Sequence, residues 1–260
     1  MLQPGSKGSL VMVEYKSVVL KFGGSVIPNE QGICQVADVV KNLSGNYNVM
    51  AVVVSAMGKT TNNLDALAHR VATKPNLREL DALLATGEMQ SAALLSMRLN
   101  QIGIPAVGYN AYQCGIKTDN NFGDAKIKQI NLSQINQLCG IPVVAGFQGI
   151  TENRELTTLG REGSDISAVI IAAAMGADFC WFFKNGGGIY DKNPKKEPDA
   201  KLFDVISYTK MLELLAQERG QVLHKRCVMD AMKYKMPLFV SGIDAGVGTW
   251  IVSKKHSKTH

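Results

Sequence analysis

The chain has 260 residues, of which 46% are hydrophobic and 19% are charged, and its formal net charge is +6 at pH 7. These proportions are typical of a compact globular protein and exclude the disordered and fibrous classes. No apolar run reaches the roughly 20 residues that a membrane-spanning helix needs, and residues 1–9 lack the apolar segment of a secretory signal. We therefore expect a cytoplasmic protein without a membrane partner.

The positive charge is not arranged as a helix-length basic face with interleaved aromatic residues, so nucleic acid binding is not expected. We assign residues 254–260 as a basic tail and residues 1–13 as a disordered or added N-terminal segment. The five cysteines are widely scattered without CxxC spacing, which favours buried reduced thiols over a zinc or redox site.

Strand-like and helix-like runs alternate along the chain, which predicts a mostly parallel sheet covered by helices on both faces. Strands are predicted at residues 18–22, 49–55, 141–147, 178–184 and 237–241. Apolar residues recur at helical spacing in 33–40 and 166–174. Ser207 is predicted to cap a further helix that Gly220 ends. Sheets of this kind bind ligands beyond the carboxyl ends of their strands, so the loops there are the candidate site.

The first predicted strand runs directly into a short loop that contains Lys21, Gly23, Gly24 and Ser25. Glycines let backbone amides approach an anion closely, and Lys21 adds a positive charge for phosphate oxygens. The loop has neither the GxGxxG spacing of dinucleotide-binding folds nor the Walker GxxxxGK[ST] spacing, which argues against both classes. The alternative is an ordinary strand-to-helix turn with an exposed lysine.

A second polar, glycine-bearing loop, residues 55–62, follows the second strand and leads into a helix. Its hydroxyl groups, among them those of Ser55 and Thr61, and the amides at the helix start are suited to hold a substrate. The alternative is ordinary helix capping by Thr60 or Thr61.

A third loop, residues 156–165, places Arg161 next to a glycine, just before a helix that Ser164 or Asp165 is predicted to cap. A guanidinium close to free helix amides is suited to bind a carboxylate or a phosphate. The four histidines form no triad or metal cluster in the sequence, so we expect structural or solvent-exposed roles for them.

The third loop also carries a family resemblance. TTLGREGSD at 157–165 is similar to the TTLGRGGSD signature of the aspartokinases in the amino acid kinase family. KFGGS at 21–25 resembles their KFGGTS, and three longer segments resemble theirs in order and spacing: VVVSAMGKTTNNL, LLATGEMQSAALL and GFQGITENRELTTLG. The resemblance extends from about Val18 to Val252.

This resemblance implies a three-layer α/β/α sandwich with a mainly parallel central sheet of about eight strands. It implies a catalytic domain over residues 14–253, with an N-terminal amino-acid-binding lobe and a nucleotide-binding lobe from about residue 175. The implied reaction uses ATP and Mg²⁺ to phosphorylate the side-chain carboxylate of L-aspartate, giving 4-phospho-L-aspartate. The metal would be held mainly through ATP phosphates, and no protein ligand is assigned to it. A homodimer is the expected assembly.

Residue roles follow from the same resemblance. Lys21, Gly23, Gly24 and Ser25 would bind the ATP phosphates, and Asp165 would act with Lys21 in catalysis by orienting it. The amino acid would be held by five polar side chains: Ser55, Thr61, Glu88, Arg161 and Ser164. Glu88 suits the substrate ammonium and Arg161 its α-carboxylate. A free aspartate side chain has a pKa of about 3.9, so it is ionised at neutral pH and needs no general base.

The nucleotide segment departs from the family pattern. The resemblance assigns nucleotide binding to Lys184, Asn185, Tyr190, Lys195 and Gln221. Asn185 stands where the family has an acidic residue, and Gln221 stands where it has a lysine. Loss of a cation weakens a phosphate site, and Lys184, Lys192 or Lys225 would have to supply the charge from another direction. Glu162 replaces the second glycine of the signature and adds a negative charge beside Arg161.

Aspartokinases usually continue into ACT regulatory domains, whereas this chain ends soon after residues 248–250, so we expect no feedback regulation within the chain. One alternative is a family member that acts on another carboxylate or on a nucleoside monophosphate, since GIYDKNPKKEPDAKLFD resembles the uridylate kinases. A second alternative is a catalytically weak ligand-binding homologue, which the changes at Asn185 and Gln221 suggest.

Overall fold

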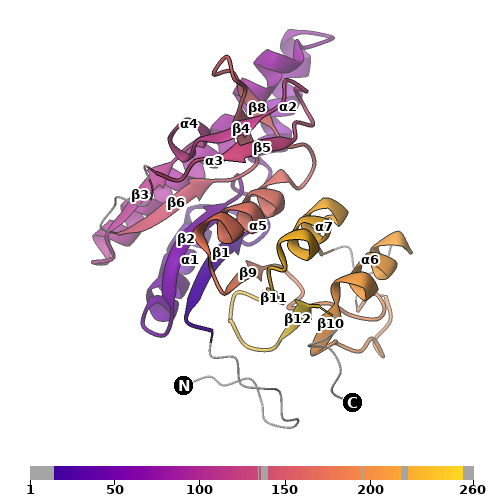
Figure 1. Ribbon diagram of the computed structural model, residues 1–260. Coiled ribbons are helices and arrows are strands. Elements are labelled where there is room, and N and C mark those ends of the chain that lie inside the picture. Colours follow the sequence, from indigo (N-terminus) through magenta and orange to yellow (C-terminus); the bar gives the residue numbers. More distant parts are fainter. Residues whose placement is uncertain (1–14, 134, 136–139, 195, 218–221, 254–260) are drawn as a thin grey trace.

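The computed structural model describes residues 15–133, 135, 140–194, 196–217 and 222–253 (Figure 1). The predicted terminal segments 1–13 and 254–260, together with Lys195, Gly220 and Gln221, lie outside the described residues. The helices are α1 (Glu30–Ser44), α2 (Thr60–Val71), α3 (Leu77–Gln101), α4 (Ala111–Cys114), α5 (Gly163–Met175), α6 (Tyr208–Ala216) and α7 (Lys225–Tyr234). The strands are β1 (Ser17–Phe22), β2 (Asn48–Val54), β3 (Ala106–Tyr109), β4 (Ile116–Thr118), β5 (Ile127–Ile130), β6 (Ile141–Ala145), β7 (Gln148–Ile150), β8 (Leu156–Thr158), β9 (Phe179–Phe183), β10 (Val205–Ser207), β11 (Leu238–Ser241) and β12 (Gly248–Val252).

Eight strands form the central sheet in the order β10-β12-β11-β9-β1-β2-β6-β3. Neighbouring strands are parallel except β11 and β12, which are antiparallel. This confirms the mainly parallel sheet of about eight strands. A second sheet, in the order β5-β4-β7-β8, was not predicted. Its strands have only three or four residues, which is too short for a period of two to stand out in a sequence.

Alternation along the strands divides the core into two layers. On β1, Val18, Leu20 and Phe22 pack in the cluster that includes the apolar residues of α1 and α3. Val19 belongs instead to the cluster on the opposite face, which includes residues of α5, α6 and α7. Because successive side chains of a strand point to opposite faces, both sheet faces are covered by helices. The three-layer architecture is thus confirmed, with α2 to α4 and α6 to α7 at opposite ends of the molecule (Figure 1).

Several predicted boundaries shift in the structure. The strand predicted at 141–147 ends at Ala145, because Phe147 has a φ of 70° that no strand accommodates, and β7 begins at Gln148. Ser207 caps α6 as predicted, its side chain accepting a hydrogen bond from Lys210 N at 3.1 Å. The same helix ends at Ala216, earlier than its predicted end at Gly220.

The predicted cap of α5 is wrong, and the alternative of ordinary capping at the start of α2 is not observed. The N-cap of α5 is Glu162, without a side-chain hydrogen bond, so Ser164 and Asp165 lie within the first turn. The N-cap of α2 is Lys59, also without a side-chain bond, so neither Thr60 nor Thr61 acts as the cap. In both loops the polar side chains are therefore not used to cap the helix that follows them.

The four cysteines that the structure describes are free, and Cys114, Cys180 and Cys227 are buried as predicted, whereas Cys34 is only half-buried. Within the described ranges, none of the helices combines the length and the apolarity that crossing a bilayer requires.

Candidate active site

Three adjacent strands bring polar side chains to one place at the carboxyl edge of the sheet. On β1, the last side chain that faces α5 is that of Lys21. The same alternation along β2 and β9 leads to the first residue after each strand, Ser55 and Lys184 respectively. The period of two along each strand selects these residues for the α5 face. The first turn of α5 carries Ser164 and Asp165 opposite this edge, so the strands and the helix supply one polar cluster.

Asp165 stands between two lysines in this cluster. Its carboxylate forms an ion pair with Lys21 and a second with Lys184, whose Nζ lies 2.7 Å from Oδ2. The side chains of Lys21 and Asp165 are 2% and 1% exposed, so this pair is withdrawn from water. Glu162 Oε2 lies 3.6 Å from Lys184 Nζ at the rim of the cluster.

The pKa shifts follow from this geometry. Burial alone would raise the pKa of Asp165, but Lys21 and Lys184 together lower it to about 2. Burial lowers the pKa of Lys21, and the neighbouring Lys184 lowers it further, against the opposing effect of Asp165. For Lys184, the attraction of Asp165 and Glu162 outweighs burial and raises the pKa. The cluster therefore keeps an ionised carboxylate between two cations in a region of low dielectric constant.

The loops after β1 and β2 interlock beside this cluster. Gly58 N donates hydrogen bonds to the carbonyl oxygens of Gly24, at 3.1 Å, and Ile27, at 2.9 Å. A Cβ at Gly24 would lie 2.6 Å from the carbonyl oxygen of Ala56, so only glycine fits there. A Cβ at Gly23 would lie 3.7 Å from Lys21 Nζ, so this glycine leaves the approach to the ammonium group open. The predicted phosphate loop is thus packed tightly against the second loop.

Glu88 reaches the second loop from α3. Its side chain is 4% exposed, and its Oε1 accepts a hydrogen bond from Ala56 N at 3.0 Å. Its Oε2 is buried and has no hydrogen-bond partner among the described residues. Burial raises the pKa of Glu88 to about 7, against the opposing effects of that hydrogen bond and of Lys21. An unpartnered oxygen on a buried carboxylate is a place for a ligand donor.

Ser55 and Ser164 join the two sides of the site, with 2.8 Å between their hydroxyl oxygens. Thr61 is half-buried in the first turn of α2. Arg161 is exposed, and the described part of the chain gives its guanidinium no ion pair. The structure therefore brings Ser55, Ser164 and the Lys21–Asp165 pair together and leaves Arg161 at the surface of the same loop.

The backbone conformation makes the departure from the family signature at Glu162 costly. This residue has a φ of 59°, in the left-handed region, where a side chain costs about 1 kcal/mol or more relative to glycine. The glycine of the TTLGRGGSD pattern is the residue that this conformation favours. The unusual conformation was not predicted, although the replaced glycine is the signal that could have revealed it.

Only some of the residues predicted to bind the nucleotide lie close to the loop of residues 21–25. Asn185 is exposed and donates to the carbonyl oxygen of Ser25 at 3.0 Å, which ties this segment to the first loop. Tyr190 is half-buried and forms an isolated antiparallel bridge with Leu202. Lys192 pairs instead with Asp199 at 2.8 Å.

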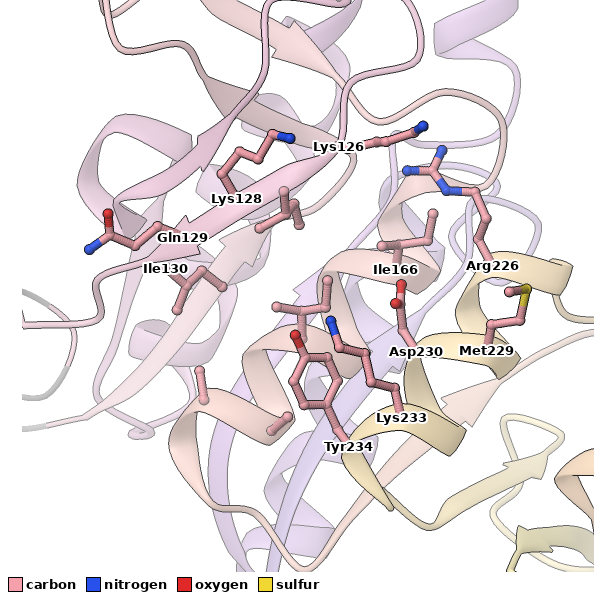
Figure 2. A pocket seen from close by; sticks show the side chains of 14 residues that line it. Lys126, Lys128, Gln129, Ile130, Ile166, Arg226, Met229, Asp230, Lys233 and Tyr234 are labelled. Carbon is pink, nitrogen blue, oxygen red and sulfur yellow. The ribbon is translucent and has the colours of Figure 1, made fainter.

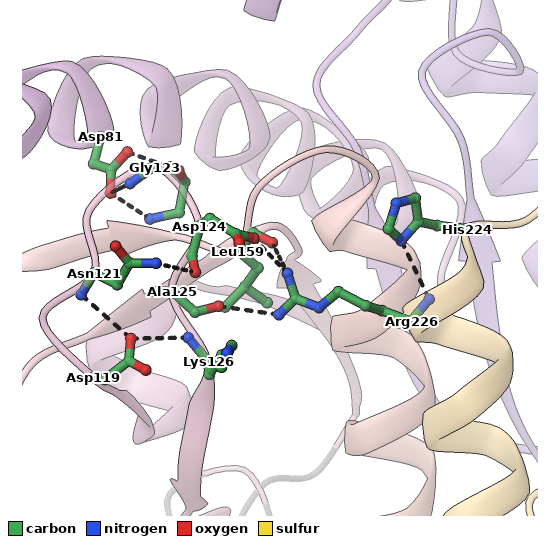
Figure 3. Close-up of polar contacts among 11 residues, drawn as sticks. Asp81, Asp119, Asn121, Gly123, Asp124, Ala125, Lys126, Leu159, His224 and Arg226 are labelled. Carbon is green, nitrogen blue, oxygen red and sulfur yellow. Dashed lines mark hydrogen bonds and ion pairs between the residues drawn. The ribbon is translucent and has the colours of Figure 1, made fainter.

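Asp81 was missed by the sequence interpretation. This residue of α3 is 1% exposed and accepts hydrogen bonds from Thr158 N at 2.8 Å, Thr158 Oγ1 at 2.7 Å and Gly123 N at 2.9 Å (Figure 3). It thereby fixes the strand that leads into Arg161. Asp81 lies seven residues before Glu88, two turns along one helix face, and this spacing is the signal that could have found it.

A groove of about 420 Å³ lies elsewhere, between β5, α5 and α7 (Figure 2). Its lining includes Lys126, Lys128, Ile166, Arg226 and Lys233, and none of the predicted site residues. This groove is therefore separate from the cluster around Asp165.

Metal-ligating side chains do not gather in threes among the described residues. His69 lies near the end of α2, with its Nδ1 3.6 Å from Asp65 Oδ1. His224 is the N-cap of α7 and accepts a hydrogen bond from Arg226 N at 3.3 Å. These two histidines have structural partners, and His256 and His260 lie outside the described residues.

Comparison with known proteins gives a consistent result. The sequence model described as "Amino acid kinase family" matches residues 16–242. An aspartokinase from Thermus thermophilus is 45% identical over 226 residues, which cover 86% of this chain and 56% of that protein. The chain covers 60% of a second relative, the aspartokinase of Geobacillus stearothermophilus, at 40% identity, and so spans less than two thirds of either relative.

Solved structures agree with this similarity. The aspartate kinase from Synechocystis has a TM-score of 0.81 at 38% identity, over 91% of this chain and 40% of that chain. E. coli aspartokinase III in complex with aspartate and ADP has a TM-score of 0.80 at 25% identity, over 92% of this chain and 65% of that chain.

Proposed function

The chain belongs to the amino acid kinase family, and we propose that it transfers the terminal phosphoryl group of ATP to the side-chain carboxylate of L-aspartate, giving 4-phospho-L-aspartate. The observation that carries this proposal is the buried carboxylate of Asp165 shared by Lys21 and Lys184. Similarity to proteins named aspartokinase, one of them solved with aspartate and ADP, supports aspartate as the acceptor.

On the phosphate side, we assign Lys21, Lys184 and the loop of Gly23, Gly24 and Ser25 to the ATP phosphates. Two ammonium groups share one buried carboxylate, whereas Glu162 is 41% exposed and its charge is screened by water. The cluster therefore presents excess positive charge to an incoming phosphate. Cations that are already positioned stabilise the charge on a transferring phosphoryl group without reorganisation during the reaction.

On the acceptor side, we assign the amino acid to Ser55, Thr61, Glu88, Arg161 and Ser164. The free Oε2 of Glu88 is suited to an ammonium donor, and the open guanidinium of Arg161 is suited to an α-carboxylate. The side-chain carboxylate is already ionised, so an oxygen of it forms the new bond to the γ-phosphorus while the bond to the ADP oxygen breaks. No proton has to be removed, and the site needs no catalytic histidine.

We propose Mg²⁺ as an ion that binds together with ATP. Asp165 is already engaged by two lysines, and the described residues offer no cluster of three acidic, histidine or cysteine ligands. Phosphate oxygens would therefore supply most of its ligands, and the bound ion would neutralise charge on them.

The test is acyl phosphate formation with ATP and Mg²⁺, trapped with hydroxylamine, with aspartate, glutamate and related acids as acceptors and UMP phosphorylation assayed in parallel. A signal with aspartate alone supports the proposal. A signal with another acid or with UMP would identify that compound as the acceptor in place of aspartate. Silence throughout, with aspartate or nucleotide binding retained in calorimetry, would instead support a ligand-binding homologue; light scattering on the same sample tests the expected homodimer.

A further inference from the structure

Arg226, in the first turn of α7, bonds to two segments that are distant from it in the sequence (Figure 3). Its Nη1 lies 2.6 Å from Asp124 Oδ1 and 3.0 Å from the carbonyl oxygen of Leu159. Its Nη2 lies 3.2 Å from the carbonyl oxygen of Ala125. A planar guanidinium can bond three oxygens at fixed relative positions, which a lysine cannot do.

These oxygens border the acceptor loop. Leu159 directly precedes Gly160 and Arg161, and Gly160 has a φ of 75°. A Cβ at Gly160 would lie 2.6 Å from Asp124 Oδ1, so the carboxylate that Arg226 binds packs directly on the Gly160 backbone. Arg226 and Asp124 together therefore restrict the turn from which the Arg161 side chain projects.

Asp81 holds the same two segments from the other side. Its carboxylate accepts hydrogen bonds from Thr158 N and Gly123 N, each next in sequence to a segment that Arg226 contacts (Figure 3). Because Asp81 and Glu88 lie on one helix, this contact sets the loop relative to α3. Arg226 then sets the same loop relative to α7.

The ion pair of Arg226 with Asp124 contributes little to the stability of the fold. The side chain of Arg226 is 29% exposed and that of Asp124 is 61% exposed, and ion pairs at such exposure contribute little to the free energy of folding. The value of the contact lies in geometry, since small displacements of a binding group reduce activity strongly.

We infer that Arg226 is a positioning residue for the acceptor site: it holds the loop of residues 159–163 so that Arg161 meets the α-carboxylate of the amino acid. This inference rests on the proposed function for the role of Arg161, although the restraint on the loop does not depend on catalysis.

The experiment compares Arg226→Ala and Arg226→Lys with Lys233→Ala, which removes a cation from the same helix without a hydrogen bond to the loop. In Arg226→Ala the KM for the acceptor should rise about tenfold or more, because Arg161 is no longer held in place, while the KM for ATP stays unchanged. Arg226→Lys should recover little, because an ammonium cannot reproduce the fork. Lys233→Ala should match the parent chain.

Chemical rescue supplies a readout that a purely structural role would not move. Arg226 lines the 420 Å³ groove, so the space left by Arg226→Ala opens to solvent. Guanidinium at a non-denaturing concentration should lower the acceptor KM of that variant and leave Lys233→Ala unaffected. An unchanged acceptor KM in Arg226→Ala, or equal effects of the two alanine variants, would overturn the inference.

Hydrogen exchange separates this inference from the proposed function. Amides of residues 159–163 should exchange faster in Arg226→Ala than in the parent chain, and at the parent rate in Lys233→Ala. If the parent chain phosphorylates no acceptor, the proposed function fails, but faster exchange confined to Arg226→Ala still supports the restraint. Equal exchange in all three proteins would overturn it.

Discussion

The two sides of the candidate site differ in how their charges are satisfied. On the phosphate side, Lys21 and Lys184 both pair with Asp165; Lys21 and Asp165 are almost completely withdrawn from water, and Lys184 is 13% exposed. On the acceptor side, Glu88 has a buried oxygen without a partner among the described residues, and Arg161 is exposed without an ion pair there. Under the proposed function, one side therefore has its cations positioned before ATP binds, whereas the other side leaves a buried carboxylate oxygen and an exposed guanidinium open to a ligand.

The largest effect is expected from Lys21→Ala, which breaks the phosphate side. Lys184 still pairs with Asp165, so the chain should fold, but kcat should fall by at least about a thousandfold because one positioned cation is lost. Steady-state kinetics measure this loss, and calorimetry should show amino acid binding nearly unchanged. Lys192→Ala, which removes an exposed lysine paired with Asp199, is the control. Full turnover in Lys21→Ala would exclude the assigned role.

Arg161→Ala tests the acceptor side. Removal of a charged partner for the α-carboxylate should raise the acceptor KM about a hundredfold, since such contacts contribute about 2–3 kcal/mol. The KM for ATP should stay unchanged. Arg70→Ala, which removes an exposed arginine of α2, is the control. If the acceptor KM does not change, Arg161 does not belong to the pocket.

Glu88 should make the use of the acceptor depend on pH. With a pKa of about 7, Glu88 loses its charge as the pH falls, so kcat/KM for the acceptor should decrease about tenfold per pH unit below 7. In Glu88→Gln, kcat/KM for the acceptor should be lower at neutral pH and should not decrease further as the pH falls below 7. If kcat/KM still decreases below pH 7 in Glu88→Gln, another group causes the pH dependence.

The same residue affects stability with a defined sign. The pKa of Glu88 is higher in the folded chain than in the unfolded chain, so protonated Glu88 favours folding at acid pH. This contribution is fully present below about pH 4.5 and is lost as the pH rises through about 7. Chemical denaturation should therefore show Glu88→Gln gaining stability relative to the parent chain between pH 5 and 8, values chosen to bracket the transition.

The smallest effect is expected from Glu162→Gly, at the boundary between the two sides. Glycine relieves the positive φ, so the free energy of unfolding should rise by about 1 kcal/mol, or about 2–4 °C in Tm. Glu162→Gln keeps the strained backbone while it removes the charge near Lys184, and should not show this gain. Equal stability of the two variants would mean that the backbone conformation carries no cost.

Five strands of the central sheet, β1, β2, β6, β9 and β11, were predictable because they are apolar runs bounded by polar loops. The other three strands, β3, β10 and β12, were not predicted, and β3 and β10 have only four and three residues. Lys21, Ser55 and Lys184 could be identified as candidates because each stands where such a run ends. The cap of α5 could not be predicted correctly, because a serine or aspartate before a helix is equally suited to capping and to binding. Only the folded chain shows that Ser164 bonds to Ser55 and that Asp165 bonds to lysines.

The sequence by itself determined the fold class, the loops of the candidate site and the family of the chain, because these depend on local periodicity and on short contiguous motifs. The tertiary structure decided which side chains share a charge. Lys184 meets Asp165 because β1 and β9 are neighbours in the sheet, and Arg226 reaches Leu159 because α7 packs beside the acceptor loop. Such contacts join residues far apart in the chain, and their distances depend on the packing of the whole molecule.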